Sequence, residues 1–109
     1  MDQLDDLTKK IIAFRDERDW KQFHNSKDLA LAISVEAGEL LELFLWKKPE
    51  DVKEEKIKEE LADILTFCIL LSEKHGFDIK QIIEDKIKIN AAKYPVEKAK
   101  GTAKKYDEL

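Results

Sequence analysis

Apolar residues recur along most of the chain at a spacing of three and four positions, which is the pattern of amphipathic helices. Four segments show it: residues 2–18, about 26–46, about 50–75 and about 79–93. Asn25 or Ser26 can cap the second segment and Asp78 the fourth, whereas Gly76 suits the end of the third. We find no convincing alternation of the kind that predicts a strand. The pattern therefore predicts an all-α protein.

Four helices joined by short links favour an antiparallel four-helix bundle. Pro49 suits the first turn of the third helix, because its missing N–H is not needed there. Behind Pro95, the stretch VEKAKGTAKKYDEL is polar, and we expect a loosely ordered C-terminal tail. The predicted organisation is one domain over residues 1–95, followed by a polar tail over residues 96–109.

The second helix is apolar on more than one face. One stripe holds Leu29, Ala32, Ile33, Leu40 and Leu43, and four more apolar residues lie around the rest: Leu31, Leu41, Phe44 and Leu45. A helix that is apolar nearly all round needs cover on both sides. Three partner helices in a small chain supply that cover poorly, so we expect a homo-oligomer, a dimer or a tetramer. The alternative is a crowded monomer core.

Acidic residues interrupt this apolar segment in the stretch VEAGELLE. On a helical wheel, Glu36 lies on the apolar stripe and Glu39 lies at its edge, three residues later. The third helix repeats the arrangement, with Glu60 on its stripe and Asp63 at the edge. If the two helices pack antiparallel, the two pairs can face each other. The pattern then predicts a cluster of four carboxylates at the edge of the core.

Such a cluster needs a compensating charge, because buried carboxylates repel and shift one another's pKa values. Only Lys56 is placed to reach one of them, Glu60. Clusters of oxygen ligands bind hard divalent cations, and Mg²⁺ commonly joins carboxylates to substrate phosphates. A metal site is one interpretation. The other is that the acids face water, as most acidic pairs on helices do.

Composition sets the remaining limits. At 109 residues, with a net charge of −4, the chain is one small domain, and its charge argues against non-specific binding to nucleic acid or an anionic membrane. Cys68 is the only cysteine and lies in an apolar run, which indicates a structural thiol in a reducing compartment. The acidic start MDQLDDLTKK lacks the features of a signal peptide. We expect a cytoplasmic protein.

The two acidic motifs, taken together, resemble those of the MazG-like nucleotide pyrophosphohydrolases. The resemblance rests on Glu36 and Glu39 in VEAGELLEL and on Glu60 and Asp63 in EELADIL. It continues upstream through RDERDWKQFHNSKDLALAIS and downstream in INAAKYP, and covers residues 5–95. Within this all-α superfamily, the sequence is most similar to the dCTP pyrophosphatase branch.

The resemblance implies a reaction. Such enzymes hydrolyse a nucleoside triphosphate to the monophosphate and pyrophosphate, with Mg²⁺ held by the four motif acids; Mn²⁺ is a possible substitute. By position these acids are Glu36, Glu39, Glu60 and Asp63, as catalytic and metal-binding residues. Glu39 is our choice for the group that accepts a proton from the attacking water. The expected substrate is a dCTP-like pyrimidine deoxynucleotide, and the expected role is cleansing of the nucleotide pool.

The resemblance also nominates substrate-binding residues. We expect base stacking from Trp20 or Trp46, phosphate or sugar contacts from Asn90, Lys93 and Tyr94, and contacts with substrate from His24 and Lys27. For each there is a structural alternative. A tryptophan at a helix end often seals a core, and a lysine near a helix C-terminus is favoured by the helix dipole.

Three other interpretations of the sequence are alternatives to a pyrophosphohydrolase. A di-iron or di-manganese bundle needs Glu-x-x-His pairs, but Lys21 and Ser72 stand three residues before the two histidines. A helical interaction module would place its acids against solvent or a basic partner. A nucleotide-binding protein without turnover is the third, although all four acids are present.

Overall fold

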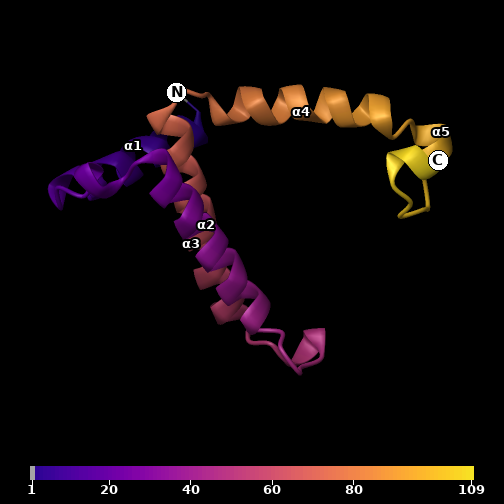
Figure 1. The fold of residues 1–109 in the computed structure, drawn as a ribbon, viewed down its shortest axis with the longest axis horizontal. Coiled ribbons are helices and arrows are strands. Elements are labelled where there is room, and N and C mark those ends of the chain that lie inside the picture. Colours follow the sequence, from indigo (N-terminus) through magenta and orange to yellow (C-terminus); the bar gives the residue numbers. More distant parts are fainter. Residues whose placement is uncertain (1) are drawn as a thin grey trace. The chain divides into compact units, whose positions relative to one another are not determined.

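A computed structural model describes residues 2–109 and shows helices without strands in that range (Figure 1). The α-helices are α1 (Gln3–Glu17), α2 (Ser26–Glu42), α3 (Glu54–Lys74), α4 (Ile79–Lys93) and α5 (Val96–Ala99). Three short 3-10 helices lie between or after them: η1 (Lys21–Phe23), η2 (Pro49–Asp51) and η3 (Tyr106–Glu108). The predicted all-α class is confirmed for the described residues. None of their helices is long and apolar enough to cross a membrane.

The first compact unit ends at Gly76 and holds α1, α2 and α3. Figure 1 shows α2 and α3 side by side as an antiparallel hairpin, with α1 at the end of the hairpin opposite the connecting turn. The hydroxyl of Ser26 and Nε2 of His75 are 2.8 Å apart, which ties the start of α2 to the end of α3. Leu29 on α2 packs as a fully buried side chain, and Ile69 and Leu70 are the buried residues of α3.

Helix ends follow from local chemistry. The side chains of Asp2, Asn25 and Asp78 each accept a hydrogen bond from the backbone N–H three residues later, at 2.8, 2.8 and 3.0 Å. These bonds satisfy N–H groups that a helix start leaves free. Gly76, with φ of 70°, ends α3 as predicted.

The second helix is shorter than predicted. It ends at Glu42, and the chain continues through hydrogen-bonded turns to Trp46, which has a φ of 60°. A positive φ is incompatible with continuing a right-handed helix. The apolar residues of this stretch extended the helical pattern beyond the true end, since periodicity alone cannot distinguish a helix from successive turns.

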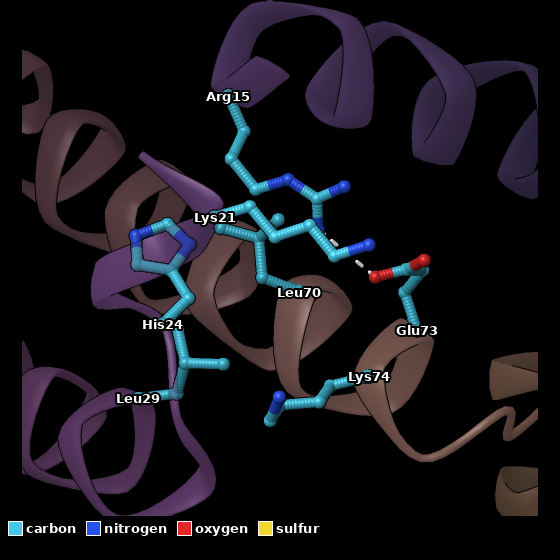
Figure 2. A pocket seen from close by; sticks show the side chains of 7 residues that line it. All are labelled: Arg15, Lys21, His24, Leu29, Leu70, Glu73 and Lys74. Atoms are coloured by element: carbon cyan, nitrogen blue, oxygen red, sulfur yellow. Dashed lines mark hydrogen bonds and ion pairs between the residues drawn. The ribbon is translucent and has the colours of Figure 1, made fainter. Parts of the chain in front are cut away.

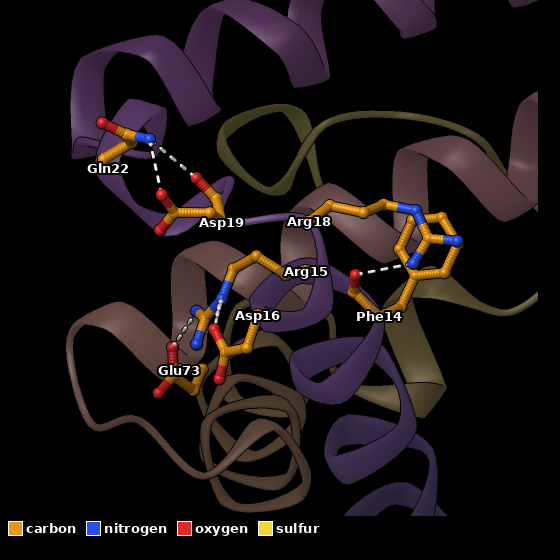
Figure 3. Close-up of polar contacts among 7 residues, drawn as sticks. All are labelled: Phe14, Arg15, Asp16, Arg18, Asp19, Gln22 and Glu73. Carbon is orange, nitrogen blue, oxygen red and sulfur yellow. Dashed lines mark hydrogen bonds and ion pairs between the residues drawn. The ribbon is translucent and has the colours of Figure 1, made fainter.

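A buried ion pair joins α1 to α3. The guanidinium of Arg15, only 5% exposed, donates hydrogen bonds to Asp16 at 2.8 Å and to Glu73 at 3.0 Å (Figure 3). Burying a charge is costly unless it is paired and hydrogen-bonded, which explains the two carboxylates. They hold the pKa of Arg15 above its usual value despite burial.

The second unit holds α4 and the residues after it. Its chain end is more ordered than the loose tail that we expected: α5 and η3 form there, and the rings of Tyr94 and Tyr106 meet edge to face at 6.2 Å. The Lys93 amine lies 4.9 Å from the Tyr106 ring centre, a favourable cation–π distance. The place of α4 in a four-helix bundle, and the domain boundary at residue 95, stay predictions.

Candidate functional site

Three of the four predicted acids meet across the α2–α3 hairpin. Glu36, from the middle of α2, and Glu60 and Asp63, from one turn of α3, bring carboxylate oxygens within 4.8 Å of one another. The i, i+3 spacing places Glu60 and Asp63 on one side of α3. Because α2 and α3 pack side by side, that side faces Glu36. The predicted meeting of acids from two helices therefore occurs in the structure.

Proximity and burial change the protonation of this group. Hydrogen bonding with Glu60, partial burial and the neighbouring charges of Glu39 and Asp63 raise the pKa of Glu36 to about 7. In addition, Oε2 of Glu36 and Oε2 of Glu60 are buried, and neither has a hydrogen-bond partner among residues 2–109. Buried polar atoms are rarely left unpaired, and such atoms call for an explanation such as an ion.

The fourth acid is close but differently placed. Glu39 lies near enough to Glu36 to raise its pKa, yet it is outside the group whose oxygens lie within 4.8 Å, and it is exposed. Lys56 does not reach Glu60; its amine lies 3.9 Å from the neighbouring Glu59. The expectation of a Lys56–Glu60 contact is wrong, and no ion pair with the clustered acids is found among residues 2–109.

The donor set fits a hard divalent cation. Three carboxylates converge, two of their oxygens lack partners, and no described cation pairs with them. Mg²⁺ prefers oxygen ligands and tolerates few of them from the protein, because it keeps several waters or binds substrate phosphates. The arrangement also leaves one side of the group exposed, since Asp63 is accessible to solvent.

An apolar pocket of about 280 Å³ adjoins the acids. Asp63 belongs both to the carboxyl cluster and to the lining of this pocket. The other lining residues are mostly aromatic or aliphatic: Ile11, Phe14, Arg15, Trp20, His24, Thr66, Phe67 and Leu70. Small-molecule sites are typically lined by apolar and aromatic side chains with a few polar groups, and this pocket has both beside the carboxylates. The structure thus places Trp20 and His24, two predicted substrate residues, next to Asp63.

One edge of this pocket is an aromatic and cationic stack. Phe14 and Trp20 meet edge to face with ring centres 5.8 Å apart, and the Arg18 guanidinium lies 3.7 Å over Phe14. Figure 3 shows Arg18 above Phe14, where it also donates to the Phe14 carbonyl at 2.9 Å. Trp20 is 44% exposed, so part of its ring remains available to a ligand.

Sequence reasoning missed several lining residues. A signal existed for Phe67, which shares the stripe of Glu60, and for Arg15, which follows Ile11 by four positions on an otherwise apolar face. Lys10 was also missed; with Asp63 it lines an adjoining pocket of about 350 Å³. A lysine on a charged helix face carries no such signal in the sequence.

Neither Trp46 nor Lys27 lines the pocket beside the acids. Trp46 is 94% exposed in the turn after α2, and Lys27 is exposed in the first turn of that helix. Asn90, Lys93 and Tyr94 belong to the second unit. Their predicted contacts with substrate stay predictions.

Comparison with known proteins identifies the group to which this chain is related. A sequence profile of the MazG-like family matches residues 31–109. The dCTP pyrophosphatase 1 of Bos taurus is 37% identical over 97% of this chain and 68% of its own length. The Homo sapiens protein of the same name is 34% identical, and the match covers 97% of this chain and 67% of the human protein. This chain belongs to the MazG-like family.

The fold agrees with this membership. A crystal structure of a pyrophosphatase from Archaeoglobus fulgidus superposes with a TM-score of 0.81 at 30% identity, covering 87% of this chain and 94% of that one. The MazG-like resemblance deduced from the acidic motifs is confirmed. So is the enzyme class, the pyrophosphate-releasing hydrolases of nucleoside triphosphates.

The carboxyl cluster of this MazG-like protein predicts a pH dependence of stability. Between the ordinary glutamate pKa of about 4.5 and the folded value of about 7, the folded state holds a proton on Glu36 that the unfolded state releases. This contribution is present in full below pH 4.5 and is lost as the pH rises through 7. In EDTA, urea denaturation should show a decline in the free energy of unfolding from pH 5.5 to 8 that is smaller in Glu36→Gln. An equal decline in both proteins would contradict the assignment.

Proposed function

We propose that this protein is a Mg²⁺-dependent hydrolase that converts a dCTP-like pyrimidine deoxynucleoside triphosphate to its monophosphate and pyrophosphate. The observation that carries the proposal is the convergence of Glu36, Glu60 and Asp63 at the mouth of an apolar, aromatic pocket. The names of the curated relatives support the choice of substrate. Such an activity would remove unwanted nucleotides from a cytoplasmic pool.

The proposed division of labour follows the geometry. Glu36, Glu60 and Asp63 hold the cation, and Glu39 joins them as a ligand or accepts the proton of the attacking water. When bound, Mg²⁺ neutralises triphosphate charge and activates that water. These carboxylates would hold the cation beside the pocket, and the amine of Lys10, which lines the adjoining pocket, would approach the phosphates. Mn²⁺ would serve as a substitute.

The base would enter the aromatic pocket. Trp20 has an exposed ring face for stacking, and Phe14 and Phe67 supply apolar walls. Burial and the charge of Arg15 lower the pKa of His24, so its imidazole is neutral near pH 7 and offers one donor and one acceptor. The phosphates would then extend toward Asp63. Five further residues stay proposed contacts with the base, sugar or phosphates of the substrate: Lys27, Trp46, Asn90, Lys93 and Tyr94.

The reaction is tested with a panel of ordinary and modified nucleoside triphosphates in Mg²⁺, with separation of pyrophosphate from orthophosphate. Glu60→Gln should reduce kcat/KM by about 100-fold or more, because it removes a carboxylate on which the cation depends. Glu59→Gln is the matched control. It removes an equal charge from the adjacent residue, which is 67% exposed and paired with Lys56.

Pyrophosphate release that is lost in Glu60→Gln and retained in Glu59→Gln would support the proposal. An absence of turnover on every triphosphate would contradict it. Saturable nucleotide binding without turnover would then indicate a binding protein, and no binding at all would favour a helical interaction module.

Stacking on Trp20 is tested separately. Aromatic–base stacking contributes about 1–3 kcal/mol, so Trp20→Ala should raise KM about 5–150-fold. Trp20→Phe keeps an aromatic face and should retain most of the affinity. If both variants raised KM equally while Tm stayed unchanged, Trp20 would not stack on the base.

We also propose a homo-oligomer, a dimer or a tetramer. Large apolar side chains are exposed in pairs four residues apart on three helices, with Leu31 and Val35 on α2, Leu61 and Leu65 on α3, and Ile83 and Ile87 on α4. Such pairs lie on one helix face and need cover. A mass of two or four chains in analytical ultracentrifugation would support the proposal. A single-chain mass at micromolar concentration would contradict it.

A further inference from the structure

A second pocket, of about 260 Å³, lies at the end of α3 beyond the aromatic one. Its lining combines residues of α1, η1, α2 and α3: Arg15, Lys21, His24, Leu29, Leu70, Glu73 and Lys74 (Figure 2). Lys74 is eleven residues from Asp63 along α3, an axial separation of about 16 Å at 1.5 Å per residue. This pocket is therefore separate from the carboxyl cluster.

The charges around the pocket are unequal. Three cations line it, Arg15, Lys21 and Lys74, against one carboxylate, Glu73. Asp16, which pairs with Arg15 from outside the lining, brings the balance to one positive charge. Among residues 2–109, neither Lys21 nor Lys74 lies within 4 Å of an acidic oxygen. A pocket with excess positive charge in a chain of net charge −4 is out of keeping with the rest of the surface.

Unused hydrogen-bond donors face the same space. The Arg15 guanidinium has five N–H groups, of which its hydrogen bonds to Asp16 and Glu73 use two. Figure 2 shows Arg15 and Lys21 reaching across Leu70 toward Glu73, with Lys74 on the facing side. The Nδ1 atom of His24 is buried and has no hydrogen-bond partner in the described part of the chain. A buried ring nitrogen without a partner indicates that a ligand or ordered water completes its hydrogen bonding.

We propose that this pocket binds a small inorganic phosphate anion, orthophosphate or pyrophosphate, through Arg15, Lys21, Lys74 and the ring of His24. A cavity of about 260 Å³ has room for such an anion with a few waters, each of which takes up about 30 Å³. Guanidinium and ammonium groups form charge-assisted hydrogen bonds with phosphate oxygens. The apolar floor of Leu29 and Leu70 limits competition from water. The proposal does not depend on turnover.

Anion binding in this pocket would affect side chains that also line the aromatic pocket. Arg15, His24 and Leu70 line both. An anion that orders Arg15 and His24 on one side fixes the same side chains on the other. The proposed site is therefore placed to alter the affinity of the aromatic pocket for its ligand.

The test is calorimetric titration of the full-length chain with orthophosphate or pyrophosphate, in EDTA and with ionic strength matched by chloride. Without divalent cations, the carboxyl cluster repels anions, so binding there does not interfere. We expect 1:1 saturable binding with a Kd on the order of 1 mM and backbone amide shifts centred on Lys21, His24 and Lys74. The tighter of the two anions identifies the occupant.

Two variant pairs with equal loss of charge make the test specific. Lys21→Gln with Lys74→Gln removes two exposed lysines of the pocket and should weaken binding by at least about tenfold. Lys80→Gln with Lys88→Gln removes two exposed lysines of α4 and should change the Kd less than about threefold. Both pairs should keep the wild-type Tm within a few degrees. Absence of saturable binding, or equal weakening in both pairs, would overturn the proposal.

Discussion

The central interaction of the candidate site is the close approach of carboxylates from α2 and α3. The antiparallel packing of α2 against α3 forces Glu36, Glu60 and Asp63 together, and Glu39 adds its charge from one turn away. In the absence of a cation, hydrogen bonding with Glu60, burial and the charges of Glu39 and Asp63 raise the pKa of Glu36 to about 7, so this group holds a proton below that pH. The same features, converging acids and unpaired buried oxygens, create affinity for a divalent cation. Without a cation, the close approach of these carboxylates is unfavourable, and it occurs where the family would be expected to bind its metal.

The two pockets lie at different positions along α3. Glu60 and Asp63 belong to the first half of the helix, Phe67 and Leu70 follow at the aromatic pocket, and Lys74 lines the second pocket near the helix end. The Arg15–Glu73 ion pair anchors α1 to the end of α3. Since α1 also contributes Phe14, this pair helps to position a wall of the aromatic pocket.

Much of this could be predicted from local sequence. Asn25, Asp78 and Gly76 fixed helix ends because capping and positive φ are properties of one or two residues. The two i, i+3 acid pairs predicted a cluster because helical spacing determines which side chains share a face. The Arg15–Glu73 pair could not be predicted, since its partners are 58 positions apart and nothing local selects one glutamate over another. The end of α2 was misplaced for a related reason: Leu43 and Leu45 continue an apolar pattern through turns that local periodicity does not detect.

The position of a bound metal decides whether Glu36, Glu60 and Asp63 form the cation site. Crystals grown with Mn²⁺ and a non-hydrolysable triphosphate analogue give an anomalous signal from the metal alone. We expect an anomalous peak whose metal lies about 2.0–2.3 Å from carboxylate oxygens of Glu36, Glu60 and Asp63. The base of the analogue should lie beside Trp20. A metal bound elsewhere, or well-ordered nucleotide with no peak among these carboxylates, would contradict this cation site.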